Sequence, residues 1–416
     1  MSKKCVIIGG GIIGLSSAYY LQKAGHEVIV IDQGAMDSGA SYVNAGYLTP
    51  SHIIPLAAPG VMQQGIKWMF SSKSPLYIKP RLNADFLKWT MAFNNSCSEK
   101  NVSKAIPAIR DINLLSRDLY SDIRAEEHFN FQLKKDGLLM LCKTEHMLEE
   151  EAHVLALANK EGLPARMLSA EEVQQKMPNA KLDIKGAAFY ECDHHTTPGE
   201  FMEEFKTLLQ AKGVQFFKNE KVTDFDTSSG TLSNVKTASG KTFVADEVIL
   251  ATGAWTGELN KKLGLKILMQ AGKGYRINSE TETGITLPSI LCEAKVAVTP
   301  MNRFTRFAGT MEIAGINHNI NKARVEAIAE AVPRYFNNVV ISEQEKDGAQ
   351  CGLRPVTPDG LPYIGRPSKW KNLTIAAGHA MMGWSLGPGT GLLVSEIIDG
   401  KKASLDLSVY NPDRRF

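Results

Sequence analysis

The alternation of apolar and polar positions predicts strands and helices in turn from the first residues onward. Residues 5–8 form a short apolar run with β-branched side chains, residues 12–24 are long enough for a helix, and residues 27–31 form a second apolar run. A strand, a helix and another strand of these lengths make one unit of a parallel sheet. The opening of the chain therefore predicts an α/β fold.

The same patterns continue to the end of the chain. Helices are expected at 84–125, 145–161, 198–213 and 320–336 and after the glycine-dense turn 378–391, and strands at 137–141, 186–190, 214–254, 265–312 and 373–377. Ser169 precedes two glutamates and is expected to cap a further helix. At 416 residues the chain exceeds one ordinary core, so two domains are expected.

Three glycines follow the first predicted strand with the spacing G-x-G-x-x-G, namely Gly9, Gly11 and Gly14. The first permits a tight turn, the second lets backbone approach a pyrophosphate, and the third lets helix and strand pack closely. The N-terminus of the following helix offers N–H groups to the phosphates. Asp32 closes the second strand, where its carboxylate is placed to accept the ribose hydroxyls. Together these residues predict an adenine dinucleotide.

Composition and charge exclude several other classes of protein. The chain is 44% hydrophobic and 22% charged, with a formal net charge of +3. Without a basic stripe, so small a charge argues against nucleic acid as a partner. The six cysteines are scattered without metal or disulfide spacing, so a cytoplasmic protein without a metal site is expected. No apolar run reaches the ~18 residues of a membrane span.

Glycine-rich segments recur far from the first one, at 251–253 and 378–391. A nicotinamide dehydrogenase would complete its cofactor site within one contiguous half of the chain. A flavin that is contacted at both of its ends needs segments from distant parts of the sequence. The recurrence therefore favours FAD over NAD.

Five separated motifs occur in a fixed order: VIIGGGIIGLSSAYYLQKAGHEVIVID at 6–32, ASYVNAG at 40–46, VILATGAW at 248–255, GLRPVTPDGLPYIG at 352–365 and AAGHAMMGWSLGPGTG at 376–391. With these five motifs in this order, the chain resembles the amino-acid-oxidising FAD-dependent oxidoreductases, which include glycine oxidase, D-amino acid oxidase and the bacterial D-amino acid dehydrogenases. The stretch 57–80 is most similar to the D-amino acid dehydrogenase subgroup.

The resemblance implies a fold of the α/β class. It consists of a discontinuous Rossmann-like FAD-binding domain and an inserted α+β substrate domain built on an antiparallel sheet. From the positions of the motifs we expect residues 1–80, 155–260 and 345–416 in the FAD-binding domain. Residues 81–154 and 261–344 are expected in the substrate domain.

The resemblance also assigns cofactor-binding residues position by position. They are Gly9, Gly11, Ile12, Ile13, Gly14, Asp32, Gln33, Ala40, Ser41, Asn44, Ala45, Gly46, Val222, Ala251, Thr252, Gly253, Gly378, His379, Gly383, Trp384, Ser385 and Leu386. Cys351 lies near the position where sarcosine oxidases attach their flavin, but the local pattern differs by one residue. Non-covalent FAD is therefore expected.

Arg354 occupies the position of the arginine that clamps the substrate carboxylate in similar enzymes. A guanidinium pairs with a carboxylate through two parallel hydrogen bonds and so fixes its orientation. The alternative is an arginine in a structural ion pair. Tyr275 and His52 are two weaker catalytic candidates. Tyr275 would donate a hydrogen bond to the substrate carboxylate, and the alternative is a half-exposed tyrosine of a strand. His52 lies just beyond the flavin loop and would face the active site.

Four further cations are expected at a pocket wall, namely Lys273, Arg276, Arg303 and Arg306. Residues 193–195, Asp-His-His, do not predict a metal site, because adjacent residues of a strand point to opposite faces of the sheet.

The preferred function is FAD-dependent oxidative deamination of a small or cyclic D-amino acid. Hydride would pass from Cα to flavin N5 and the electrons then to a quinone or another acceptor. The alternatives are a D-hydroxyproline dehydrogenase, a glycine- or sarcosine-type amine oxidase, and a non-catalytic flavoprotein subunit of an amine dehydrogenase complex. The amphipathic region 53–70 fits either peripheral contact with the inner face of the cytoplasmic membrane or a pocket-lining loop.

Overall fold

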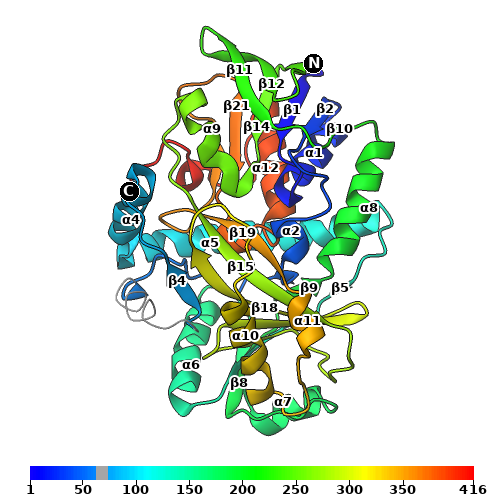
Figure 1. Ribbon diagram of the computed structural model, residues 1–416, viewed down its shortest axis with the longest axis vertical. Coiled ribbons are helices and arrows are strands. Elements are labelled where there is room, and N and C mark those ends of the chain that lie inside the picture. Colours follow the sequence, from blue (N-terminus) through cyan, green and yellow to red (C-terminus); the bar gives the residue numbers. More distant parts are fainter. Residues whose placement is uncertain (62–73) are drawn as a thin grey trace.

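The computed structural model describes residues 1–61 and 74–416, and residues 62–70 of the predicted amphipathic region 53–70 lie outside the described residues. One sheet has the strand order β10-β2-β1-β14-β21-β20 (Figure 1). Its strands are β1 (Lys4–Ile8), β2 (Glu27–Ile31), β10 (Gln215–Phe217), β14 (Glu247–Leu250), β20 (Tyr363–Gly365) and β21 (Leu373–Ala377). All neighbouring pairs are parallel except β20 with β21. The predicted Rossmann-like sheet is therefore present.

Both faces of this sheet are covered, which explains why its strands read as continuous apolar runs. Ile7 and Val30 pack in a core with the helices α1 (Ile12–Lys23), α8 (Pro198–Ala211) and α12 (Gly387–Asp399). Val6 and Ile29 point to the opposite face. There they meet a small sheet made of β11 (Val222–Ser228), β12 (Thr231–Thr237) and β13 (Thr242–Val244).

The α1 and α12 helices approach each other closely because α12 begins with glycines. An added Cβ at Gly387 would overlap the side chain of Ile12, and one at Gly391 would overlap the backbone of Ser16. On another side of α12, Gly389 lies against Ser116 of α5 (Glu99–Glu126). The glycine-dense turn that the sequence analysis linked to the cofactor therefore also packs three helices together.

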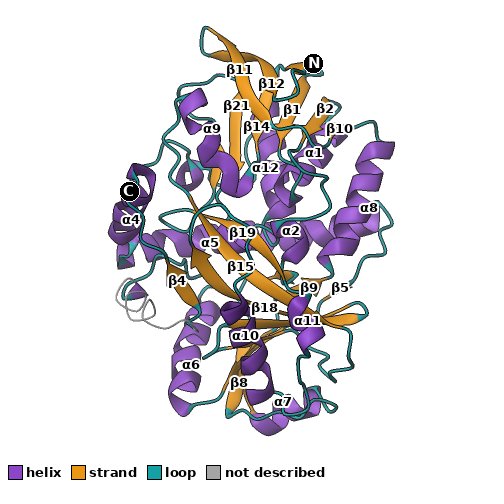
Figure 2. Ribbon diagram, viewed as in Figure 1, coloured by secondary structure: helices purple, strands orange, loops and turns teal. Residues whose placement is uncertain are grey.

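A second, larger sheet has the order β19-β15-β18-β17-β16-β6-β8-β7, with β4 beside β18 (Figure 2). Its strands are β4 (Leu76–Ile78), β6 (Leu138–Cys142), β7 (Ala165–Ser169), β8 (Gly186–Tyr190), β15 (Gln270–Ser279), β16 (Ser289–Leu291), β17 (Val296–Met301), β18 (Phe304–Ile313) and β19 (Gln350–Val356). The sheet was expected to be antiparallel, but β16 pairs with β6, and β18 with β4, in parallel. It is therefore a mixed sheet.

The remaining elements connect and cover these sheets. The helices are α2 (Ala40–Val43), α4 (Ala84–Ser96), α6 (Glu145–Lys160), α7 (Ala170–Lys176), α9 (Thr256–Leu263), α10 (Lys322–Ala331) and α11 (Glu343–Asp347), and a three-stranded ribbon joins β3 (Tyr47–Leu48), β9 (His194–Thr196) and β5 (Leu133–Lys134). Short 3-10 helices lie at Gly253–Trp255, Val332–Arg334, Ala380–Met382 and Ser408–Tyr410. Ser169 caps α7 in a capping box with Glu172, as its position predicted.

The larger sheet does not follow the predicted domain boundaries. Strands β7 and β8 lie within 155–260 and β19 within 345–416, yet all three belong to the larger sheet. The predicted boundaries differ from the extent of the larger sheet because they were placed from the cofactor motifs, and the strands between those motifs contain no such motif. The division of the chain into two domains remains a prediction.

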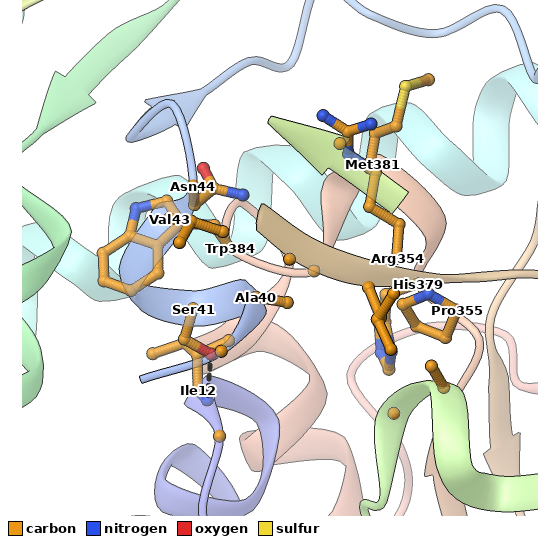
Figure 3. Close-up of a pocket in the computed structure, with 18 of the residues that line it drawn as sticks. Ile12, Ala40, Ser41, Val43, Asn44, Arg354, Pro355, His379, Met381 and Trp384 are labelled. Carbon is orange, nitrogen blue, oxygen red and sulfur yellow. Dashed lines mark hydrogen bonds between the residues drawn. The ribbon is translucent and has the colours of Figure 1, made fainter. Parts of the chain in front are cut away.

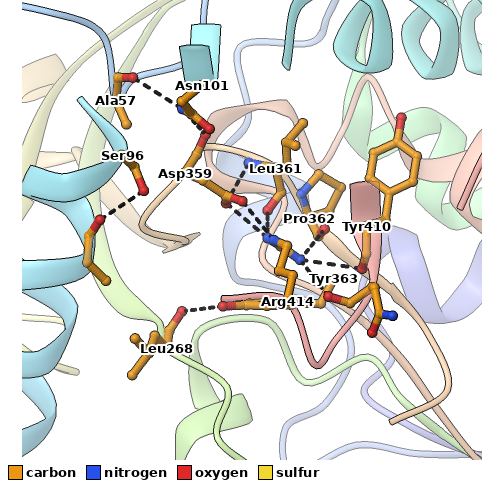
Figure 4. Close-up of polar contacts among 12 residues, drawn as sticks. Ala57, Ser96, Asn101, Leu268, Asp359, Leu361, Pro362, Tyr363, Tyr410 and Arg414 are labelled. Carbon is orange, nitrogen blue, oxygen red and sulfur yellow. Dashed lines mark hydrogen bonds and ion pairs between the residues drawn. The ribbon is translucent and has the colours of Figure 1, made fainter. Parts of the chain in front are cut away.

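The C-terminal residues are tied to the body of the protein by one buried ion pair (Figure 4). Arg414 Nε lies 2.7 Å from Asp359 Oδ2, and both side chains are over nine-tenths buried. Arg414 also donates to the carbonyl of Leu361 at 2.6 Å and stacks on the ring of Tyr363. Asn101 of α5 donates to the carbonyl of Asp359, so the pair links three segments of the chain.

Candidate active site

A cavity of about 1040 Å³ is lined by residues from both large sheets (Figure 3). At one end lie the β1–α1 turn and the loop around Ser41, and at the other lie β15, β18 and β19. Residues that the sequence analysis collected from distant motifs therefore meet around one space.

The β1–α1 turn forms the nucleotide end of the cavity. Gly9 has φ of +109°, which favours glycine, and an added Cβ there would overlap the carbonyl of Ala251. Gly11, the residue before α1, has no side chain to cap the helix, so the backbone N–H groups of its first turn other than that of Ile12 are available at this helix end. Asp32 accepts from the backbone N–H groups of Gly10 at 2.6 Å and Gly34 at 2.7 Å. These bonds fix the orientation of its carboxylate at the cavity wall.

The loop that follows β2 is held in place by two side chains. Ser41 Oγ accepts from the backbone N–H of Ile12 at 3.0 Å, the dashed contact in Figure 3. Arg306 donates through one nitrogen to the carbonyls of Tyr42 at 2.9 Å and Asn44 at 2.6 Å. Burial lowers the pKa of Arg306 to about 9. Arg306 thus positions the cofactor loop.

The expectation that Lys273, Arg276, Arg303 and Arg306 form a pocket wall is wrong, because none of these four residues lines the cavity. Arg303 is exposed in the turn between β17 and β18. Arg306 points instead to the backbone of the loop after β2. Strand periodicity alone does not show which face of this sheet borders the cavity.

Arg354 lies on β19 and reaches the substrate end of the cavity. Its guanidinium donates to the carbonyl of Thr310 at 2.6 Å, and it packs over Gly274, where a Cβ would overlap it. Burial lowers the pKa of Arg354 to about 10. Among the described residues its hydrogen-bond partners are the Thr310 carbonyl and the Met311 sulfur, which carry no negative charge. The geometry therefore favours the carboxylate-binding interpretation over a structural ion pair.

Thr310 is held in an unusual backbone conformation beside Arg354. Its φ is +69°, which is rare for a β-branched residue, and the register between β15 and β18 shifts at this point. Between the pairs Lys273–Glu312 and Tyr275–Gly309, the single residue Gly274 of β15 faces two residues of β18, Thr310 and Met311, which is a β-bulge. The bulge presents the Thr310 carbonyl to the guanidinium.

Tyr275 borders the cavity, but its ring belongs to the buried core of the larger sheet. Its hydroxyl donates to Glu312 at 2.9 Å, and Glu312 also pairs with Lys273 at 3.2 Å. Burial, the hydrogen bond to Glu312 and the charge of Glu312 raise the pKa of Tyr275. Its hydroxyl is therefore engaged inside the sheet and is not directed at a substrate.

The segment 379–385 lines the cavity through residues with partners in the core. His379 Nε2 lies 3.0 Å from the hydroxyl of Thr390, and burial lowers the pKa of His379 to about 3. Trp384 donates from Nε1 to Thr196 at 2.9 Å. Ser385 donates to Asn113 at 2.6 Å. These contacts make the segment a rigid wall.

Most of the predicted residues line the cavity. They are Gly9, Gly11, Ile12, Ile13, Asp32, Gln33, Ala40, Ser41, Asn44, Ala45, Val222, Ala251, Thr252, Gly253, His379, Gly383, Trp384 and Ser385, together with His52, Tyr275, Cys351 and Arg354. Four of the predicted cofactor-binding residues lie outside the lining: Gly14, Gly46, Gly378 and Leu386. For the three glycines, an added Cβ would overlap neighbouring atoms, so their function is close packing.

Several cavity residues carried no signal in the sequence. Met140, Ile290, Ala297 and Ala308 line the cavity from strands of the larger sheet. Lys295 lies at the same wall, just before β17. Each is a single position in an alternating strand or in a turn. The sequence pattern of such a segment is the same whether that face of the strand borders a cavity or solvent.

The family model for FAD dependent oxidoreductases matches residues 4–397 of the chain. The chain belongs to this family. The D-amino acid dehydrogenase of Cereibacter sphaeroides is 30% identical over 99% of this chain and 97% of its own length. That of Helicobacter pylori is 32% identical over 95% of both chains. The family and FAD predictions from the sequence are thus confirmed.

Solved structures share the fold. Glycine oxidase from Geobacillus kaustophilus superposes with a TM-score of 0.78 over 100% of both chains, at 21% identity. L-proline dehydrogenase from P. horikoshii gives 0.75 over 99% of this chain and 97% of its own, at 20% identity. The predicted combination of a Rossmann-like sheet with a second sheet is confirmed.

The residues of this chain fit FAD. A side-chain-free turn at Gly9 and Gly11, the first turn of α1 and an oriented carboxylate at Asp32 all lie at the cavity. An added Cβ at Gly9 would overlap the carbonyl of Ala251, so only glycine lets the turn lie this close to the neighbouring strand end. The protein is therefore an FAD-dependent oxidoreductase.

Proposed function

We propose that the protein oxidises a small or cyclic D-amino acid to its imine, which water converts to a 2-oxo acid and ammonia. The observation that carries the proposal is the Arg354 guanidinium, which faces the FAD cavity and whose hydrogen-bond partners within residues 1–61 and 74–416 are uncharged. The names of the two dehydrogenase relatives support D-amino acids as the substrate class.

Each end of the cavity has a separate task in this reaction. Asp32 would bind the ribose of FAD, the N-terminus of α1 its pyrophosphate, and residues 379–385 its ring system. Bound FAD supplies the acceptor for the hydrogen and electron pair of the substrate Cα–H bond. Arg354 binds the substrate carboxylate through two hydrogen bonds and so limits the orientations of Cα.

We assign the side chain of the substrate to the part of the cavity wall that is formed by Met140, Ile290, Ala297 and Ala308. These apolar side chains offer no hydrogen bonds to a polar group of the substrate. A short aliphatic or a cyclic side chain suits this wall. Lys295 at its edge is exposed to solvent.

We propose a quinone as the electron acceptor, reached by peripheral contact with a membrane. No helix in the described ranges has the length and apolar character needed to cross a bilayer. Leu82, Leu87 and Met91, in and just before α4, are exposed by 101%, 49% and 68%. Lys79 and Lys88 are exposed beside them. Apolar side chains with neighbouring cations suit an anionic lipid surface.

Anaerobic mixing of the holoenzyme with a panel of D- and L-amino acids, D-hydroxyproline, glycine and sarcosine tests the proposal. We expect the flavin absorbance to bleach with small and cyclic D-amino acids and not with their L-enantiomers. A preference for sarcosine or glycine would replace the proposed substrate class. No bleaching by any amine would identify a non-catalytic flavoprotein.

Leu87→Asp with Met91→Asp tests the membrane contact. We expect this double variant to lose binding to anionic vesicles while it still reduces a soluble dye at the wild-type rate. Retained vesicle binding would contradict the proposed contact at α4.

A further inference from the structure

A chain of hydrogen bonds leads from the cavity into the interior through His52, Ser51 and Asp193. The ribbon of β3 and β9 brings these residues together, because Leu48 pairs with His194 and the segments beyond them then meet. The Ser51 hydroxyl donates to Asp193 Oδ2, and the Ser51 N–H donates to Oδ1 at 3.1 Å. The same hydroxyl oxygen lies 3.0 Å from His52 Nδ1. His52 lines the cavity that also contains Arg354.

The chemistry of the three groups fixes the direction of these bonds. In its ionised form, which is the one that can take up a proton, the Asp193 carboxylate only accepts hydrogen bonds, so the single hydroxyl hydrogen of Ser51 points to it. The Ser51 oxygen then accepts from Nδ1–H of His52. Burial and the charge of Lys295 lower the pKa of His52 to about 4, so the ring is neutral at neutral pH. A neutral ring protonated at Nδ1 carries its lone pair at Nε2, where it accepts a proton.

Asp193 has an environment that a purely structural clamp would not need. It is fully buried, and its hydrogen-bond partners are neutral: Ser51 and the thiol of Cys192. Burial raises the pKa of Asp193 to about 7, although the bonds from Ser51 and the charge of Arg117 lower it. Tyr190 also faces this carboxyl group. A buried carboxylate without an ion-pair partner is costly, and an asparagine would clamp the loop without that cost.

We propose that His52, Ser51 and Asp193 form a proton relay that takes one proton from the substrate ammonium group. An N–H bond of the ammonium breaks and an Nε2–H bond forms on His52. The Nδ1 hydrogen moves to Ser51 Oγ while the Ser51 hydrogen moves to Asp193. One proton is transferred in total, and no atom changes its oxidation state. The proton returns to water by the reverse path after the product has left.

The relay rests on the proposed function, because only an amine substrate brings this proton to the cavity. Amino acids carry an ammonium group at neutral pH. The nitrogen lone pair must be free before a C=N bond can form as Cα loses its hydride. Arg354 holds the carboxylate and, as a cation at neutral pH, cannot accept this proton. His52 is therefore the base that lets the substrate react at a pH where its free form is protonated.

The pH dependence of anaerobic flavin reduction tests the relay, with D-alanine and D-proline as substrates. The variants are Asp193→Asn and His52→Asn, in which the asparagine keeps a donor near the position of Nδ1. At neutral pH we expect both to lower the limiting reduction rate by roughly 10²-fold, the usual contribution of a general base. Above the pKa of the substrate ammonium the loss should disappear, because the amine then arrives neutral.

The matched control is His26→Asn, which removes another buried histidine that pairs with an aspartate, Asp399, at 2.8 Å. His26 does not line the cavity, and its variant should follow the wild-type pH profile. Ser51→Ala breaks the same relay if Asp193→Asn does not fold, and it should show the same rescue at high pH. Flavin content and visible spectrum should match the wild type in every variant.

Three outcomes would count against the relay in different ways. A loss of equal size at every pH would overturn it and indicate a structural clamp. A second outcome is that His52→Asn loses activity at neutral pH and recovers it at high pH, while Asp193→Asn and Ser51→Ala lose none. This outcome would overturn the assignment of Asp193. No reduction of wild-type flavin by any D-amino acid would instead overturn the proposed function on which the relay rests.

Discussion

The two ends of the cavity are built from different materials. At the nucleotide end the contacts come from backbone atoms and missing side chains, as at Gly9, Gly11 and the N-terminus of α1. At the substrate end they come from side chains on separate strands, such as Arg354 on β19, and from a loop that carries His52. We therefore expect the nucleotide end to be most sensitive to substitutions that add atoms to a glycine. The substrate end should be most sensitive to substitutions that change the chemical group of a side chain.

Gly14→Ala should have the largest effect, because its Cβ would overlap the carbonyl oxygen of Gly9. The α1 helix must then move away from β1, which costs about 1–3 kcal/mol or more in a packed core. We expect purified protein with most of its FAD lost and a lower Tm. The ratio of flavin to protein absorbance and a thermal melt measure this. Gly199→Ala is the matched control, since nothing lies within 4 Å of its added Cβ.

Arg354→Lys should be the next largest change and should leave FAD bound. A lysine cannot reproduce the two parallel hydrogen bonds to a carboxylate, a loss of about 2–4 kcal/mol. We expect kcat/KM to fall by roughly 10²-fold, mainly through KM. Arg303→Lys, at the exposed turn, should leave the kinetics unchanged. Loss of FAD in Arg354→Lys would show that this arginine is structural.

Gly274→Ala tests whether the position of Arg354, rather than its presence, limits the substrate end. The new Cβ would overlap the guanidinium and displace it from the Thr310 carbonyl. We expect kcat/KM to fall by about tenfold, or ~1.4 kcal/mol. The same change in the Arg354→Lys background should have a smaller effect, because the two residues are in contact. Additive losses would mean that Gly274 acts elsewhere.

Arg306→Met should give the smallest effect on the kinetics, because it acts only at the cofactor end. It removes the two hydrogen bonds to the loop carbonyls of Tyr42 and Asn44. At about 0.5–1.5 kcal/mol each, we expect FAD to bind roughly tenfold more weakly. Titration of apoprotein with FAD measures this. At saturating FAD, KM for the amino acid should stay at the wild-type value, and a change there would contradict the assignment.

The nucleotide end could be predicted from the sequence because its residues follow one another at fixed spacing. A strand, a turn and a helix place Gly9, Gly11 and Asp32 together in any chain that folds this way. The glycines after residue 378 were harder to interpret. Gly387 and Gly391 fit the cofactor pattern, but in the structure they pack α12 against α1. A glycine at the start of a helix has the same sequence pattern whether it lies beside a cofactor or beside another helix.

The substrate end was less predictable. Tyr275 has the right residue type for a carboxylate donor, but the face of β15 that it occupies is set by the packing of the sheet. The bulge at Thr310 changes the register of the neighbouring strand, and no local pattern announces it. Hydrogen-bond partners such as Ser51 and Asp193 lie far apart in sequence and meet only through β3 and β9.

The sequence by itself determined the family, the FAD cofactor and the position of Arg354 in its motif, because these depend on short segments with local geometry. The tertiary structure decided what surrounds them. It gave Arg354 a carbonyl in place of an acidic partner, turned the Tyr275 hydroxyl to Glu312, and placed a buried Asp193 behind His52. Contacts between separate strands follow from how the sheets twist and pack, and no fixed spacing in the chain records them.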